Sequence, residues 1–359
     1  MRTIDIDLPQ NAYPVYLGRG LLEKPGTWSR HLGDGKVLVV SNDTVAPLYL
    51  DSMLAALGER EVQTHIIPDG EQFKTVETWQ GILDRLVTMQ ARRDAVIVAL
   101  GGGVVGDISG YAAASYMRGI RFVQAPTTLL AQVDASVGGK TGVNHVRGKN
   151  LIGAFHQPST VIIDSESLDT LPAREFNAGM AEVVKYGAIG DPEFFAWLED
   201  NAQAIASRDA EAIDRLIEVS VLNKADVVRQ DEKEAGVRAL LNFGHSFGHA
   251  LESETAYSEF LHGEAVAIGM VTAARLSENR VLCETGTAKR LSALLEKFDL
   301  PTRIPPHLDV ARLADALALD KKAVASGLRL VLLNAIGEAV IDSDSTNEQI
   351  LDAIQASRG

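Results

Sequence analysis

Strand-like and helix-like segments alternate through the first half of this chain, and this order limits the fold more than any other feature. Short apolar runs bounded by polar residues or glycine predict four buried strands: Lys36–Val40, Asp94–Leu100, Arg121–Ala125 and Thr160–Asp164. Between them, apolar residues at helical spacing predict two helices: Val45–Leu57 and Val76–Ala91. Such alternation is typical of a parallel sheet covered by helices on both faces, so we expect a Rossmann-like α/β domain.

The second half has a different pattern. From about Pro172 onward, apolar residues recur at helical spacing, and strand-like runs are scarce apart from Leu328–Leu333. The spacing predicts helices over Phe195–Ile205, Ala212–Val228, Ala265–Leu276 and Thr287–Phe298. We therefore predict an α/β domain over residues 1–170 and a mostly α-helical domain over residues 171–359, with the functional site in the cleft between them.

The composition limits which partners the protein can bind and in which compartment it is found. The net charge of −14 argues against nucleic acid or an anionic membrane as a partner. The single cysteine, Cys283, excludes an intramolecular disulfide and fits a reducing compartment. Met1–Leu8 lacks the basic start and apolar stretch of a signal peptide, and no apolar run approaches the ~20 residues that span a bilayer. We expect a cytoplasmic protein.

A glycine-rich turn follows the second predicted strand. Gly101, Gly103 and Gly106 match the spacing of a dinucleotide-binding loop, where backbone N–H groups approach a pyrophosphate. The usual fingerprint also has an acidic residue about 20 positions later, but Arg118 and Arg121 stand in that region. The loop alone therefore leaves open a nucleotide site or a simple turn. Two further polar turns could hold the nucleotide: Asn42 and the segment Asp69–Lys74.

A basic segment rich in glycine and threonine runs from Arg118 to Asn150. Lysine offers a point charge and glycine lets the backbone close in, so this composition suits a phosphate. Gly138–Thr141 resembles a Walker loop superficially. The first glycine of that motif is missing, since Asp134 and Ala135 stand in its place, and a P-loop nucleotide hydrolase is therefore disfavoured.

Three of the eight histidines fall in one short stretch, at 245, 249 and 262. His245 and His249 are four apart and would share one face of a helix. Upstream, Glu182 and Lys185 are three apart on a predicted helix. A carboxylate with two histidines and an open position is the ligand set of a catalytic zinc ion. The spacing does not choose between His245 and His249 as the ligand.

Long segments of the chain resemble the dehydroquinate synthase family. The most specific are SVGGKTGVN, AGMAEVVKYG, LNFGHSFGHALE and LHGEAVAIGM, and the resemblance runs from about residue 36 to residue 340. It implies a phosphate-eliminating lyase of the shikimate pathway, which leads to chorismate and the aromatic amino acids. The substrate would be 3-deoxy-D-arabino-heptulosonate 7-phosphate and the products 3-dehydroquinate and phosphate. The family reaction proceeds by transient oxidation with NAD, phosphate elimination, re-reduction and intramolecular aldol closure.

The resemblance also implies cofactors and residues. The cofactors are NAD and a divalent metal, zinc or cobalt, which the same ligand set serves equally. The implied metal ligands are Glu182, His245 and His262, with His249 beside them. The implied NAD-binding residues are Asn42, Asp69, Gly70, Glu71, Gln72, Phe73, Lys74, Gly103, Val104, Val105, Gly106, Asp107, Thr127, Thr128, Lys140, Lys149, Ser167, Leu168, Asp169 and Thr170.

The remaining implied residues bind substrate or move protons. The catalytic set is Lys185, His249, Glu234 and Asn150. The substrate-binding set is Arg118, Asp134, Lys140, Asn150, Lys185, Lys224, Arg238, Asn242, His249 and a late lysine, Lys322 or its neighbour Lys321. Arg238 and Asn242, four apart, are expected to share a helical face and, with Lys224, to bind a carboxylate. In the family the arginine at the position of Arg118 reaches in from a neighbouring subunit, which implies a homodimer.

Three other interpretations compete with this one. A related sugar-phosphate cyclase could act on a different substrate, a metal-dependent polyol dehydrogenase could share the architecture and release NADH, and a dinucleotide-binding scaffold could have lost its activity. The lysines suited to phosphate argue against the dehydrogenase, and Arg238 and Lys224 favour a substrate with a carboxylate.

Overall fold

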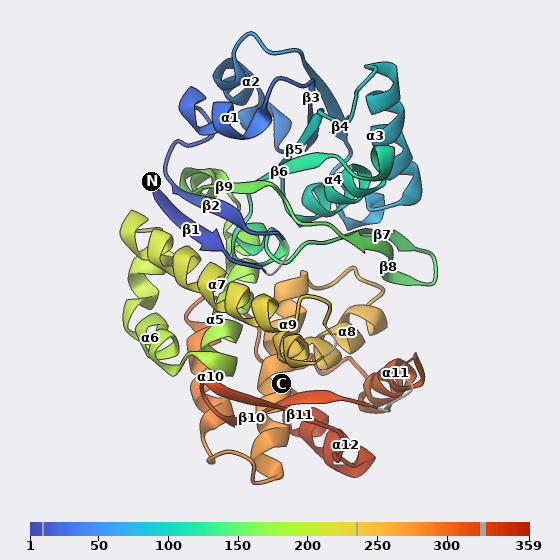
Figure 1. Cartoon of the computed structure of the whole chain (residues 1–359). Coiled ribbons are helices and arrows are strands. Elements are labelled where there is room, and N and C mark those ends of the chain that lie inside the picture. The colour runs from blue at the N-terminus through green and yellow to red at the C-terminus, as the bar shows by residue number, and fades with distance from the viewer. Residues whose placement is uncertain (9–10, 235, 324–327) are drawn as a thin grey trace. The chain divides into compact units, whose positions relative to one another are not determined.

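The computed structural model describes residues 1–8, 11–234, 236–323 and 328–359 (Figure 1). The chain forms two compact units. The first unit comprises Met1–Leu171 and Lys224–Glu232, and the second comprises Pro172–Asn223 and Lys233–Gly359. Helix α7 (Ala210–Gln230) therefore contributes to both units.

A seven-stranded sheet is the centre of the first unit, with the strand order β1-β2-β9-β6-β5-β3-β4. Its strands are β1 (Arg2–Ile6), β2 (Tyr13–Gly18), β3 (Val37–Asn42), β4 (Val62–Ile67), β5 (Val96–Gly101), β6 (Arg121–Pro126) and β9 (Thr160–Asp164). All neighbouring pairs are parallel except β1 and β2. The carboxyl ends of the parallel strands therefore meet at one edge of the sheet, where open α/β sheets bind ligands.

The two faces of this sheet pack against different helices. Every residue of β3 and of β5 is buried, as the apolar runs of central parallel strands require. Side chains alternate between faces: Val96 and Val98 join one core cluster, whereas Ile97 and Ala99 join the other. One cluster includes residues of α1 (Pro25–Leu32) and α2 (Ala46–Leu57), and the other includes residues of α3 (Val76–Thr88) and α4 (Gly103–Ser115).

The four predicted strands and two predicted helices of this unit are confirmed. The sequence patterns missed β1, β2 and β4, which lie at or near the sheet edges, where burial is incomplete and apolar runs are interrupted. They also missed an antiparallel hairpin, β7 (Lys140–His145) and β8 (Gly148–Phe155), inside the glycine-rich basic segment. A methyl group on Gly153 would lie 2.2 Å from the carbonyl oxygen of Thr141. Only a glycine at this position therefore lets β8 lie this close to β7.

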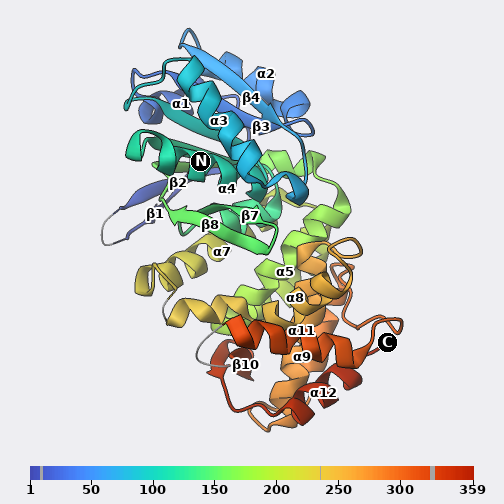
Figure 2. The same cartoon turned by 90° about the vertical axis from the view of Figure 1, so that its right-hand side faces the viewer.

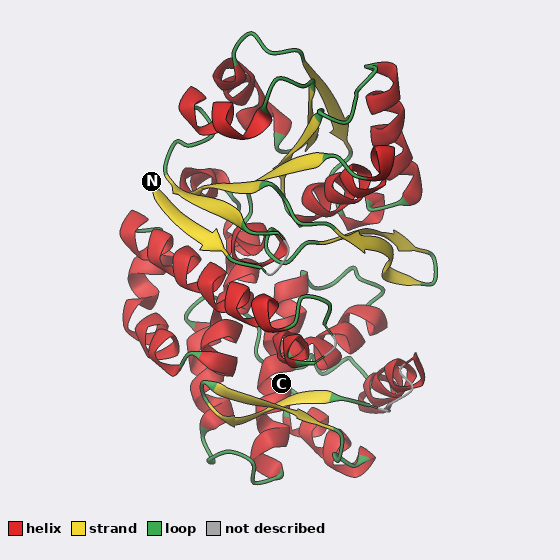
Figure 3. Cartoon of the chain, viewed as in Figure 1, coloured by secondary structure: helices red, strands yellow, loops and turns green. Residues whose placement is uncertain are grey.

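The second unit is mainly helical (Figures 2 and 3). Its helices are α5 (Ala173–Gly190), α6 (Pro192–Ala206), the first part of α7, α8 (His245–Glu254), α9 (His262–Asn279), α10 (Thr287–Glu296), α11 (Val310–Ala323) and α12 (Asn347–Ala356). The four helices predicted here are confirmed, and the late apolar run forms β10 (Leu330–Ala335), which pairs with β11 (Glu338–Asp342). Helix α9 is central, because every residue of Ala265–Ala274 is buried and α5, α8, α10 and α12 all contact it.

None of the helices among the described residues combines the length and the apolar character that crossing a membrane requires.

Candidate active-site residues

Three potential metal ligands of the second unit converge. Glu182 lies on α5, His245 is the first residue of α8 and His262 is the first residue of α9. Glu182 Oε1 is 3.4 Å from His245 Nε2 and 3.8 Å from His262 Nε2. Ligands about 2.0–2.1 Å from a tetrahedral zinc ion are separated by roughly 3.3 Å, so the donor atoms fit a divalent ion.

The electrostatics of this cluster favour ligation. The Glu182 side chain is 2% exposed, and its Oε2 contacts the ammonium of Lys185, one helical turn along α5. Burial lowers the pKa of His245 well below its ordinary value, and the charge of Lys185 and the neighbouring His262 and His249 lower it further. A neutral imidazole keeps a lone pair for a metal ion. His245 is therefore ready to bind without first losing a proton.

The ring orientations of the two histidines agree with this arrangement. His245 Nδ1 lies 3.3 Å from the carbonyl oxygen of Phe243, and His262 Nδ1 lies 3.4 Å from Glu252 Oε1. In the tautomer with a proton on Nδ1, each ring donates to that oxygen and turns its Nε2 lone pair toward Glu182. Glu252 was not among the predicted site residues, although its position three residues after His249 on one helix is a usable signal.

His249 lies beside this cluster and is exposed. Its ring centroid is 5.6 Å from that of His245 and 6.1 Å from that of His262. His249, Glu252 and His262 form a second group whose donor atoms lie within 4.8 Å of one another. The spacing argument left His245 and His249 as alternatives, and the structure turns His245, not His249, toward Glu182.

The close approach of α5 and α9 depends on a glycine next to a ligand. A methyl group on Gly263 would lie 1.9 Å from the carbonyl oxygen of Ala178, on α5. Only glycine therefore lets the start of α9 pass this close to α5 without displacing the backbone. Gly263 follows His262 directly, so this contact helps to fix one ligand opposite Glu182.

One expectation about the substrate residues is wrong. Arg238 and Asn242 lie in a 3₁₀ segment, η5 (Val237–Asn242), not in an α-helix. With three residues per turn, residues four apart do not share a face. Arg238 is buried, whereas Asn242 is exposed and donates from Nδ2 to Glu234 Oε1 at 3.1 Å.

In the first unit, two predicted nucleotide-binding side chains meet where β3 and β4 end: Asn42 is the last residue of β3, and Asp69 follows β4. Asn42 Nδ2 donates to Asp69 Oδ1 at 2.6 Å, and Asn42 Oδ1 accepts from the Val45 backbone at 2.7 Å. Thr44 Oγ1 donates to the other Asp69 oxygen at 2.9 Å. These contacts fix the Asp69 carboxylate at the carboxyl edge of the sheet, a place suited to a ribose hydroxyl.

The glycine loop also lies at this edge. Strand β5 ends at Gly101, and α4 begins at Gly103 with no side chain capping its amino end. The N–H groups of the first helical turn therefore suit a phosphate. The Thr127 N–H donates to Gly101 O at 3.0 Å, which places the threonine pair after β6 next to the loop. The buried Thr127 Oγ1 has no hydrogen-bond partner among the described residues, as expected where a polar ligand completes the site.

Lys74 connects three segments of the first unit. Its Nζ is 2.5 Å from Asp107 Oδ2 and 2.6 Å from Asn150 Oδ1. The Asn150 N–H donates to Asn144 Oδ1 at 2.9 Å, and Asn144 donates in turn to Glu71 Oε1 at 2.7 Å. Asn150 has a φ of 55°, a left-handed conformation that these contacts maintain. Asn144 was not among the predicted site residues.

The other predicted residues of this unit are more dispersed. Lys224 Nζ donates to Asp134 Oδ1 at 2.8 Å and to its backbone carbonyl at 2.6 Å. Lys140 and Arg118 are exposed, and Arg118 has a φ of 66°. The predicted segment Ser167–Thr170 lies in η4 (Ser165–Thr170). The side chains of Lys321 and Lys322 lie outside the described part of the structure.

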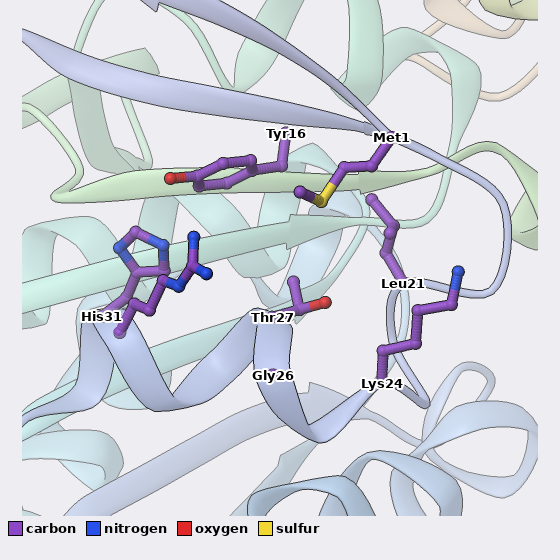
Figure 4. Close-up of a pocket in the computed structure, with 8 residues that line it drawn as sticks. Met1, Tyr16, Leu21, Lys24, Gly26, Thr27 and His31 are labelled. Carbon is purple, nitrogen blue, oxygen red and sulfur yellow. The ribbon is translucent and has the colours of Figure 1, made fainter.

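A cavity of about 330 Å³ in the first unit lies among Met1 and residues of β2, α1 and the turn between them (Figure 4). Its lining residues are Met1, Tyr16, Leu21, Lys24, Gly26, Thr27, Arg30 and His31. None of them belongs to the predicted site, so this cavity is separate from the nucleotide-binding residues described above.

Comparisons with known proteins identify the family. The family model for the 3-dehydroquinate synthase N-terminal region matches residues 64–178, and the C-terminal one matches residues 179–323. The chain belongs to the 3-dehydroquinate synthase family. It is 53% identical to the 3-dehydroquinate synthase of Methylococcus capsulatus over 95% of both chains. It is 49% identical to that of Colwellia psychrerythraea over 99% of this chain and 100% of the relative. The predicted family and enzyme class, a phosphate-eliminating lyase, are confirmed.

Solved structures of other enzymes share the fold of this chain. A 2-deoxy-scyllo-inosose synthase complexed with carbaglucose-6-phosphate, NAD⁺ and Co²⁺ has a TM-score of 0.91 at 26% identity, covering 99% of this chain and 100% of that one. A 2-epi-5-epi-valiolone synthase from Streptomyces hygroscopicus with NAD⁺ and Zn²⁺ bound has a TM-score of 0.89 at 32% identity, covering 98% of each. A probable glycerol dehydrogenase from Sinorhizobium meliloti, 18% identical over 95% of each chain with a TM-score of 0.62, shares the fold alone.

Proposed function

We propose that this chain converts 3-deoxy-D-arabino-heptulosonate 7-phosphate to 3-dehydroquinate and phosphate, with Glu182, His245 and His262 holding the divalent metal. The observation that carries the proposal is the convergence of one carboxylate oxygen and two imidazole nitrogens, with separations of 3.4 and 3.8 Å from Glu182 Oε1. Names of relatives that cover nearly the whole chain support the substrate. Zinc and cobalt both suit this N/O donor set.

The two cofactors supply the chemistry that side chains lack. When bound, the metal polarises substrate oxygens as a Lewis acid, and NAD accepts and returns a hydride. The residues proposed to hold NAD are the polar turn Asn42, the segment Asp69–Lys74, the loop Gly103–Asp107, the pair Thr127 and Thr128, the lysines Lys140 and Lys149, and the segment Ser167–Thr170. The uncapped amino end of α4 and the buried hydroxyl of Thr127 support this assignment.

The catalytic roles go to Lys185, His249 and Glu234 of the second unit and to Asn150 of the first. Lys185 neutralises the buried Glu182 carboxylate and so limits the cost of holding a charged ligand out of water. His249 is exposed and adjoins both histidine ligands, which suits a group that exchanges protons with substrate oxygens. Glu234, paired with Asn242, is the other candidate base.

The proposed phosphate-binding residues are Lys140, Asn150 and Arg118, and those for the carboxylate are Arg238, Asn242 and Lys224. Asp134 holds the ammonium of Lys224 in place through two contacts. A late lysine, Lys322 or Lys321, completes the set. Arginine and lysine suit these anionic groups, arginine through its planar fork and lysine as a point charge.

We further propose a cytoplasmic homodimer that binds neither nucleic acid nor membrane. The single cysteine and the net charge of −14 support the compartment and the absence of polyanionic partners. Exposed apolar side chains near Arg118 support the dimer: Met117 is 43% exposed and Phe155 is 48% exposed. Their segments adjoin, since His156 Nε2 lies 2.9 Å from the carbonyl oxygen of Ile120. A second copy would cover this surface.

The test is a phosphate-release assay with the heptulosonate phosphate, with and without NAD and a chelator. We expect release that stops when the metal is stripped and returns on adding Zn²⁺ or Co²⁺. Glu182→Ala should lower turnover by at least about a thousandfold, because several kcal/mol of transition-state stabilisation depend on the metal. Glu175→Ala, an exposed carboxylate on the same helix, is the matched control.

Two results would contradict the proposal. One is phosphate release that continues after metal analysis shows the ion removed. The other is equal turnover of a sugar phosphate that lacks the carboxylate, which would instead indicate a related cyclase with a different substrate, as the similarity to the inosose and valiolone synthases allows.

A further inference from the structure

His262 presents its two ring nitrogens to two different carboxylates. Nε2 lies 3.8 Å from Glu182 Oε1, and Nδ1 lies 3.4 Å from Glu252 Oε1. We propose that Glu252 is a positioning residue of the metal centre: it accepts the Nδ1–H of His262 and so holds Nε2 toward Glu182. This inference rests on the proposed function, because it takes the Glu182 group as the metal site.

The geometry separates this role from direct ligation by Glu252. Two imidazole Nε2 atoms face the same oxygen of Glu182, whereas the group around Glu252 includes the exposed His249. His245 has the equivalent arrangement, because its Nδ1 faces the carbonyl oxygen of Phe243. In both rings, Nδ1 thus faces an oxygen that can accept its proton in a hydrogen bond, and the Nε2 lone pair faces Glu182. This is the usual arrangement of histidines that bind metals.

The surroundings of Glu252 make its carboxylate a fixed acceptor. It is 3% exposed and lies on α8, which packs against α9. The start of α9 is fixed as well, since the Leu261 N–H donates to Glu264 Oε2 at 2.8 Å. The backbone of His262 is therefore held, and the remaining freedom is rotation of its ring. A buried carboxylate at Nδ1 removes that freedom and raises the basicity of Nε2.

The experiment measures metal affinity directly. Wild-type holoenzyme and its variants are titrated with a chelator of known affinity for Co²⁺, and the Kd is obtained from the competition. Glu252→Ala should weaken Co²⁺ binding roughly 10–100-fold, the usual effect of losing an outer-shell partner. Glu252→Gln should lose less, because its amide oxygen still accepts the Nδ1–H. Glu254→Ala, on the same helix and paired with Arg312, should stay within about twofold of wild type.

The visible absorption spectrum of the Co²⁺ form distinguishes positioning from ligation. With Glu252→Gln, we expect band positions and intensity that match wild type, because the three ligands are unchanged. A spectrum that shows a changed ligand set would overturn the positioning role, as would a Glu252→Ala variant that binds Co²⁺ as tightly as wild type. Circular dichroism checks the fold of both variants. If the alanine variant is misfolded, the Kd and the spectrum of Glu252→Gln decide the outcome.

Failure of this inference can be told apart from failure of the proposed function. Glu182→Ala and His262→Ala should abolish Co²⁺ binding if the metal site is correct. If they do and Glu252→Ala does not weaken it, only the role of Glu252 falls. If Glu182→Ala keeps full affinity, the metal site itself is wrong.

Discussion

The Lys74 ammonium lies 2.5 Å from a carboxylate oxygen of Asp107, and the two side chains are only 5% and 23% exposed. The same nitrogen donates to Asn150 Oδ1 at 2.6 Å. Burial opposes the charge on Lys74, but the carboxylates of Asp107 and Glu71 outweigh it and raise its pKa. Lys74 is therefore a charged centre that ties the turn after β4 to α4 and to the β7–β8 hairpin.

Replacing Lys74 with methionine should destabilise the protein as well as weaken NAD binding. The change removes the cation paired with the partly buried Asp107, and breaking a buried pair costs up to roughly 3–5 kcal/mol. Urea unfolding measures the loss, and fluorescence titration measures the Kd for NAD. Lys289→Met, at an exposed position, should change the free energy of unfolding by under about 0.5 kcal/mol. A Lys74→Met variant with wild-type stability and weak NAD binding would show that Lys74 serves the nucleotide alone.

The depressed pKa of His245 predicts a pH dependence of stability in the metal-free protein. Its pKa in the folded state lies below the ordinary value, mainly because the ring is buried. The unfolded chain therefore binds a proton that the folded chain does not. The stabilisation is fully present above about pH 6.5 and is lost as the pH falls below it toward the folded pKa, by at most about 1.4 kcal/mol per pH unit.

Urea unfolding of the metal-free protein between pH 8 and pH 5 checks this prediction. His245→Gln should show a shallower loss of stability below about pH 6.5 than wild type. His307→Gln removes an exposed histidine that pairs with Glu259 and should retain most of the slope. Equal slopes in wild type and His245→Gln would contradict the proposed cause.

Gly263→Ala should disturb both packing and metal binding. The added methyl group would lie 1.9 Å from the carbonyl oxygen of Ala178, so the start of α9 must move. Overpacking of this kind costs roughly 1–3 kcal/mol, and the neighbouring His262 should lose alignment with Glu182. Gly190→Ala is the matched control, since a methyl group there meets nothing within 4 Å. Thermal unfolding and Co²⁺ titration should show losses for Gly263→Ala alone. An unchanged unfolding temperature and an unchanged Kd for Co²⁺ in both variants would mean that α5 and α9 can move apart without loss of stability.

The proposed homodimer predicts complementation between two inactive variants. If Arg118 acts across subunits, each Arg118→Ala chain retains its own Glu182 and needs only a partner's arginine. Co-refolding Arg118→Ala with Glu182→Ala should then restore activity, up to about a quarter of wild type if chains pair at random. Phosphate release from the mixture measures it, and each variant alone is the control. No gain in a mixture shown by light scattering to be dimeric would place Arg118 in its own subunit's site.

Local pattern was sufficient for elements with a well-defined buried surface. Strand β5 (Val96–Gly101) is a continuous apolar run because both of its faces are buried, and helix α6 repeats its apolar residues at helical spacing because it buries one face. The β7–β8 hairpin was missed because its glycines and lysines resemble a phosphate loop locally, and only strand pairing shows that Gly153 serves close contact. The 3₁₀ geometry of η5 places Arg238 and Asn242 on different faces. Their separation of four residues in the sequence could not distinguish a 3₁₀ helix from an α-helix.

The sequence by itself determined the alternation of strands and helices, the family, and the kinds of group at the site: one carboxylate and a cluster of imidazoles. The spacing alone left His245 and His249 open as the ligand, and the family resemblance implied His245. Only the tertiary structure showed that the His245 ring nitrogen faces Glu182 and that Glu252 lies behind His262. Periodicity records which face of a helix is buried. The direction of a ring nitrogen depends on atoms from three helices, α5, α8 and α9, which meet only when the chain has packed.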